Sequence, residues 1–189
     1  TSSADVCLPN SRLMKSQFLN DNSPIITCST GTGNNQAIGV VRLSGDFSLT
    51  SINQFFSMDL AKVKPRYAHF VDIGKTCLVD KALFIFFKGP NSFTGEDVVE
   101  LHLHGNPHIM SEVIEMAKKL GAVMAQPGEF SKRAFLNGQL SLDQVEAIAD
   151  IIHAKSSRAA KSAVLSLDGA LRGRVEHFQS QLMALRVLL

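Results

Sequence analysis

The chain has 189 residues, of which 45% are hydrophobic and 19% are charged, and its formal net charge is +2. This composition suits a globular protein with a proper core, and it excludes a broadly basic surface that would bind nucleic acid by charge alone. The three cysteines are far apart and form no CxxC pair, so neither a disulfide framework nor a zinc knuckle is indicated. No apolar run reaches the roughly 18 residues that a membrane span needs, and no signal peptide is visible. We therefore expect a reduced, cytoplasmic protein that does not enter the membrane.

The N-terminal part of the chain begins with a polar stretch and continues with strand-like runs. Residues 1–23 are rich in Ser and Asn and lack a periodic pattern, so we predict a flexible arm. Short apolar runs predict strands over residues 25–29 and 38–43, separated by a glycine-rich loop at 31–35. Arg42 lies inside the second run, where a charged residue either faces solvent at an edge or holds an anion.

Three further elements are expected before residue 88. Amphipathic spacing predicts a short helix over residues 46–57, and a strand is predicted over residues 66–73. Residues 82–87 are apolar on both faces, so we predict a central strand of the sheet.

Residues 88–108 combine a turn-rich loop, an alternating strand and a helix start. Apolar side chains alternate with Glu100, His102 and His104, which would share the polar face of the strand. Asn106 can cap the following helix, with Pro107 at its first position. The polar face has three interpretations: a solvent-facing strand surface, a metal site that needs further ligands, or a site for a heterocycle with many N–H donors.

Helical signals dominate the rest of the chain. A helix over residues 109–120 is followed by a strand at 122–125 and a short helix at 129–136, in which Lys132 and Arg133 are expected to face solvent. Ser141 and Gln144 predict a capping box, and a second helical run over residues 159–182 includes two glycines. The predicted fold class is α/β (α+β), a mixed β-sheet with flanking helices over residues 24–138, followed by an α-helical segment at 139–189.

Three blocks of the sequence carry a family resemblance. PNSFTGEDVVELHLHGNP (90–107), PGEFSKRAFLNG (127–138) and LDQVEAIADIIHA (142–154) closely resemble the N-terminal part of the tRNA modification GTPase (MnmE, TrmE) family, in the same order and with the same intervals. The resemblance runs from about residue 25 to the C-terminus. It implies that residues 24–138 form a domain like the tetrahydrofolate-binding domain of aminomethyltransferases, and that residues 139–189 begin a helical domain.

The resemblance also implies a function for the parent protein. Members of the family are cytoplasmic enzymes that, with the flavin-dependent partner MnmG (GidA), add an aminomethyl-type group to the wobble uridine of certain tRNAs. The N-terminal region is expected to bind a one-carbon tetrahydrofolate, such as the 5-formyl or methylene form, and to form a homodimer. GTP, Mg²⁺ and K⁺ would belong to a GTPase domain whose motifs this chain lacks, so we expect no catalytic residue and no metal site here.

The folate contacts of the family map onto Arg42, Glu100 and Gln139 of this chain. A carboxylate such as Glu100 can accept two adjacent donors of a pterin ring, and Arg42 can hold a carbonyl group or the glutamate tail of the folate. Gln139 replaces a lysine of the family pattern and loses its charge, and the loop at 32–37 lacks the arginine of the family. A second hypothesis is therefore a dimerisation and scaffolding module in which folate binding has been lost.

Overall fold

The structure is a computed structural model that describes residues 23–31, 35–47, 49–56, 59, 62–74 and 77–188. Most of the predicted N-terminal arm and of the glycine-rich loop lies outside the described residues. The chain divides into two compact units that meet between Phe130 and Ser131, within helix α4, whereas the sequence placed a boundary at residue 138. Each unit is described by itself below.

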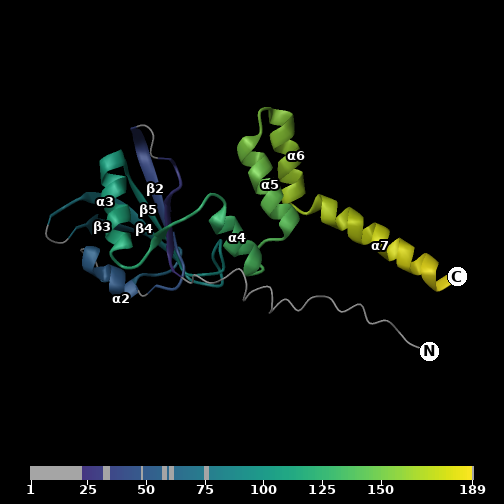
Figure 1. Ribbon diagram of the computed structural model, residues 1–189, viewed down its shortest axis with the longest axis horizontal. Coiled ribbons are helices and arrows are strands. Elements are labelled where there is room, and N and C mark those ends of the chain that lie inside the picture. The colour runs from purple at the N-terminus through teal and green to yellow at the C-terminus, as the bar shows by residue number, and fades with distance from the viewer. Residues whose placement is uncertain are drawn as a thin grey trace. The chain divides into compact units, whose positions relative to one another are not determined.

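The first unit is built on a mixed six-stranded sheet, as the sequence predicts (Figure 1). The strands are β1 (Ile25–Cys28), β2 (Gln36–Ser44), β3 (Ala68–Ile73), β4 (Asp80–Phe87), β5 (Val98–Gly105) and β6 (Val123–Met124). Their order across the sheet is β3-β4-β5-β2-β1-β6. The pair β1–β6 is parallel, and the remaining pairs are antiparallel. Strands β2 and β5 therefore lie side by side at the centre, although a long stretch of sequence separates them.

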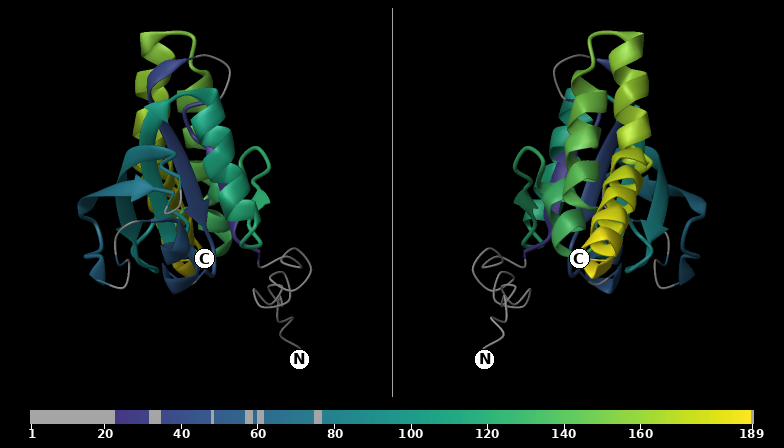
Figure 2. Two further views of the ribbon diagram at one scale, coloured as in Figure 1. Left: turned by 90° about the vertical axis from the view of Figure 1, so that its left-hand side faces the viewer. Right: turned by 90° about the vertical axis from the view of Figure 1, so that its right-hand side faces the viewer.

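Helix α3 (Pro107–Lys118) covers one face of this sheet (Figure 2). It begins as predicted, because the Asn106 side chain accepts a hydrogen bond from the backbone N–H of His108 and Pro107 occupies the first turn. The helix buries Met110, Val113 and Ile114 against the sheet. A Cβ atom at Gly39 of β2 would collide with the Met110 sulfur, so the glycine permits this close approach.

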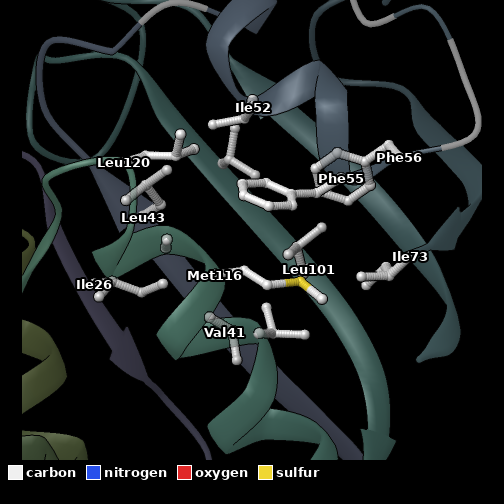
Figure 3. A pocket seen from close by; sticks show the side chains of 13 residues that line it. Ile26, Val41, Leu43, Ile52, Phe55, Phe56, Ile73, Leu101, Met116 and Leu120 are labelled. Carbon is white, nitrogen blue, oxygen red and sulfur yellow. The ribbon is translucent and has the colours of Figure 1, made fainter. Parts of the chain in front are cut away.

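The core between the sheet and the helices contains a small apolar cavity of about 40 Å³ (Figure 3). Leu101 of β5 and Met116 of α3 line it, together with Phe55 of the short helical segment nearby. A cavity of this size has room for only a few water molecules, and an apolar lining disfavours them. This face of the sheet is therefore packed as a core.

The predicted helix over residues 46–57 is shorter in the structure. It consists of α2 (Leu49–Ile52) and a 3₁₀ turn, η1 (Asn53–Phe55). Phe56 is extended instead, bridges to Ile73 of β3, and packs its ring edge-on against Phe84 with the ring centroids 5.4 Å apart. Burial of this ring in the core outweighs the local helical pattern.

The opposite face of the sheet, called the outer face below, is more open. Strand β4 has a neighbour on both sides, as predicted for a central strand, but only one of its faces is buried. Leu83 of β4 is 41% exposed and Phe70 of β3 is 66% exposed. These two residues are cross-strand partners, so their side chains lie together on the outer face.

The second unit is helical. Beyond α4 (Glu129–Leu136) it contains α5 (Leu142–His153), α6 (Ser157–Leu167) and α7 (Ala170–Leu188). The capping box of Ser141 and Gln144 is present. The predicted helical run over 159–182 is interrupted, because Gly169 adopts a φ of +81° between α6 and α7. In the part of the chain that the structure describes, no helix is both long and apolar enough to cross a membrane.

Candidate functional site

The outer face of the sheet brings Arg42 and Glu100 together. Arg42 of β2 and Glu100 of β5 are direct cross-strand partners, so the alternation of each strand places both side chains on the same face. The Arg42 Nε atom donates a hydrogen bond to Glu100 Oε1 at 2.8 Å, and Arg42 Nη2 lies 2.6 Å from the same oxygen. The sequence predicted both residues as ligand contacts, and the structure places them side by side.

This pair is partly shielded from water. The exposed fractions of the Arg42 and Glu100 side chains are 29% and 16%, so the attraction between the charges is screened less than on an open surface. Both guanidinium donors converge on Oε1, whereas Oε2 points toward His102, with Oε2 and His102 Nε2 3.7 Å apart. A carboxylate has about four acceptor positions, so Glu100 keeps capacity for donors of a ligand.

Two aromatic rings flank the guanidinium group. The Arg42 Cζ atom lies 5.6 Å from the centroid of the Phe93 ring and 5.7 Å from that of Phe130. Phe93 comes from the loop between β4 and β5, and Phe130 comes from the start of α4. Aromatic faces attract a cation and offer flat, apolar surfaces to a planar heterocycle. The site therefore combines an acceptor group, a cation and two rings.

A buried hydroxyl network fixes the loop that carries Phe93. Ser44 of β2 and Thr94 are fully buried, and their hydroxyl oxygens lie 2.7 Å apart. Ser44 Oγ also donates to Glu96 Oε2 at 2.8 Å, which leaves Thr94 as the donor to Ser44. The loop is thereby tied to the same strand that carries Arg42.

His104, the second histidine of the strand, interacts with Asp80. The backbone N–H of His104 donates to Asp80 Oδ2 at 2.9 Å, and its Nδ1 lies 2.7 Å from Asp80 Oδ1. The His104 ring therefore interacts with Asp80 and is not available to Glu100. Among the described residues, no group of three or more His, Cys, Asp or Glu side chains is placed to hold a metal ion. The metal interpretation of Glu100, His102 and His104 therefore lacks support from the geometry.

The third predicted contact, Gln139, belongs to the second unit. It is exposed in the segment after α4, where its backbone N–H donates to the Ala134 carbonyl at 2.8 Å. Arg133, which the sequence assigned to solvent, is 7% exposed, so that expectation is wrong, whereas Lys132 is exposed as expected.

Sequence reasoning did not identify the two aromatic rings as part of the site. Phe93 and Phe130 both lie within the blocks that carry the family resemblance, so the blocks contain a signal for them. Their approach to Arg42 arises from contacts over long sequence separations, which residue spacing alone cannot predict.

Comparison with known proteins agrees with this description. Residues 24–139 match the family model of the GTP-binding protein TrmE N-terminus. The chain is 45% identical over 166 residues to the tRNA modification GTPase MnmE of Aquifex aeolicus (strain VF5), covering 86% of this chain and 36% of that protein. It is 43% identical over 173 residues to the tRNA modification GTPase MnmE of Marinomonas sp. (strain MWYL1), covering 90% of this chain and 37% of that protein.

The match therefore concerns one region of longer proteins. The chain spans little more than a third of the length of these relatives. The family model covers more than half of the chain, and the identity extends over most of it. The chain thus belongs to the tRNA modification GTPase MnmE (TrmE) family and corresponds to its N-terminal region.

Proposed function

We propose that this chain is the folate-binding and dimerising N-terminal region of a tRNA-modifying GTPase. The observation that carries the folate proposal is the pairing of Arg42 with Glu100 on the outer face, with the rings of Phe93 and Phe130 close to the guanidinium group. A tetrahydrofolate derivative, in its 5-formyl or methylene form, has the complementary chemistry. Its pterin ring offers two adjacent N–H donor groups, and its tail carries carboxylates.

Each group has a distinct role in this proposal. Glu100 accepts hydrogen bonds from the ring N–H and from the amino group of the pterin. Both are charge-assisted hydrogen bonds. Arg42 neutralises the carboxylate and donates to a ligand oxygen with its remaining N–H groups. Gln139 stands at the family position of a lysine, and a glutamine there can form hydrogen bonds but carries no charge.

The activity of the whole protein is part of the same proposal. The curated relatives are named tRNA modification GTPases. We infer that the parent protein hydrolyses GTP with Mg²⁺ and K⁺ in a further domain. Together with an MnmG-type flavin protein, it modifies the wobble uridine of tRNA in the cytoplasm. The N-terminal region supplies the one-carbon donor in this scheme.

Calorimetric titration of the 189-residue chain with 5-formyltetrahydrofolate tests the folate site. Glu100→Gln keeps the size of the side chain but replaces one acceptor oxygen with a donor, so the affinity should fall by at least about tenfold. Glu115→Gln is the matched control, because Glu115 is an exposed glutamate on α3, which covers the other face of the sheet. Equal affinity of the wild-type chain and Glu100→Gln, or no binding by the wild type, would reject the folate site.

The second candidate is a module that dimerises without binding folate. The exposed apolar pair of Phe70 and Leu83 supports homodimerisation under either candidate, because large apolar side chains on an open sheet face favour association. The loss of the lysine charge at Gln139 favours the scaffolding candidate. An absence of folate binding combined with a stable dimer would select it.

A further inference from the structure

His102 is the second polar residue beside Glu100, and one of its ring nitrogens lacks a partner. It follows Glu100 by two positions on β5, so both side chains lie on the outer face. Its Nε2 atom is buried and, among the described residues, has no hydrogen-bond partner. Glu100 Oε2 lies 3.7 Å from Nε2, which is close enough for electrostatic attraction but too long for a hydrogen bond. A buried donor or acceptor left in this state is unfavourable.

The other neighbours of His102 in the sheet cannot satisfy this nitrogen. Its cross-strand partners are Val40 on β2 and Leu83 on β4, which are both aliphatic. The ring of His104, two positions further along β5, is engaged by Asp80. Among the described residues, Glu100 is the acidic side chain that lies within 4 Å of this nitrogen, so it is the acceptor toward which the histidine can close.

We propose that His102 is a positioning residue for Glu100 in the folate site, an inference that rests on the proposed function. A movement of roughly 0.7 Å converts the present contact into an Nε2–H···Oε2 hydrogen bond. Glu100 is then held by Arg42 at one oxygen and by His102 at the other. This fixes the plane of the carboxylate. One acceptor position then remains at Oε2, and a second opens at Oε1 when one of the two Arg42 donors turns to a ligand oxygen.

The fixed carboxylate selects the ligand by the pattern of donors on its ring edge. A 4-oxo pterin presents the N3–H and the 2-amino group as two adjacent donors, which match two acceptor oxygens. A 4-amino pterin lacks the N3–H and offers two adjacent donors to a carboxylate only from its other edge, through a protonated N1–H and the 2-amino group, which requires a different ring pose. If Glu100 turns freely, it can accept this second pose, and the discrimination weakens. His102 therefore acts on specificity through Glu100.

The test compares the affinities of the 189-residue chain for 5-formyltetrahydrofolate and for the 4-amino analogue of tetrahydrofolate. We expect the wild-type chain to prefer the 4-oxo ligand by at least about tenfold, and His102→Leu to reduce this preference to about threefold or less. His102→Gln keeps an N–H donor and should restore most of the preference. His108→Leu is the matched control, because His108 is exposed on α3, on the other side of the sheet.

A double-mutant cycle separates a positioning role from a structural one. In a Glu100→Gln background, His102→Leu should leave the ratio of the two affinities unchanged, because the carboxylate that His102 positions is no longer present. A His102→Leu variant that lowers both affinities equally in the wild-type background has a structural role only, and this result would overturn the proposal. If the wild-type chain binds 5-formyltetrahydrofolate but His102→Leu keeps the full preference, the inference fails while the proposed function stands. If the wild-type chain binds neither ligand, both fail.

Discussion

At the residue scale, the buried hydroxyl of Thr94 stabilises the loop that carries Phe93. Thr94 is fully buried and hydrogen-bonded to Ser44, so Thr94→Val preserves its shape but removes the donor. We expect the free energy of unfolding to fall by about 1–2 kcal/mol, because the buried Ser44 loses a partner. Urea unfolding of both chains measures the difference.

A matched substitution at an exposed threonine serves as the control for Thr94. Thr30 is exposed, and its hydroxyl accepts a hydrogen bond from the backbone N–H of Val40 at 3.1 Å. Water can replace that hydroxyl, so Thr30→Val should change the free energy of unfolding by no more than about 0.5 kcal/mol. Equal losses for the two variants would show that burial of the Thr94 hydroxyl does not determine its contribution.

The sequence is informative about single residues where strand alternation applies. Arg42 and Glu100 could be predicted as site residues from the family pattern, and alternation correctly placed Glu100 and His102 on one face. The rings of Phe93 and Phe130 could not be predicted as neighbours of Arg42, because a loop and a helix start bring them there from distant parts of the chain. The burial of Arg133 was missed because helical position alone does not reveal what covers a side chain.

At the element scale, local signals located most strands and helices, and tertiary contacts decided where they end. The capping box at Ser141 and the proline start of α3 are local devices, and both are present. The helix predicted to continue to residue 57 stops early because Phe56 joins the core and pairs with Ile73. The break at Gly169 was missed because a glycine has two possible roles. It can lie inside a helix at a modest cost, or it can end a helix by adopting the left-handed conformation.

Two glycines of the helical unit test that termination directly. Gly169 has a φ of +81°, which is unfavourable for alanine, so Gly169→Ala should lower the free energy of unfolding by about 1 kcal/mol. Gly173 lies within α7 in open space, so Gly173→Ala should raise helical stability by about 0.5–1 kcal/mol. Thermal unfolding followed by far-ultraviolet circular dichroism compares the two variants. A stabilising Gly169→Ala would mean that α6 and α7 form one continuous helix in solution.

At the scale of the whole molecule, the two faces of the sheet have different roles. The face under α3 is closed by apolar packing, and residues such as Val41 and Leu101 are almost fully buried there. The outer face carries the Arg42–Glu100 pair and, on the neighbouring strands β4 and β3, the exposed side chains of Leu83 and Phe70. The proposed ligand site and the proposed association surface thus share one face, on which β5 lies between β2 and β4.

Homodimerisation through the outer face is the last prediction. A symmetric dimer uses the same patch on both copies. A charge introduced at Phe70 and Leu83 would therefore contact the same charge of the second copy, or would be removed from water when the copies associate. The wild-type chain should therefore sediment at about twice its mass of 20.5 kDa, and the double variant Phe70→Asp/Leu83→Asp should sediment as a monomer with an unchanged circular dichroism spectrum. Leu165→Asp, at a 61% exposed position of α6 in the helical unit, should leave the dimer intact. A double variant that remains dimeric would place the interface elsewhere, and a monomeric wild type at micromolar concentration would reject homodimerisation by this chain.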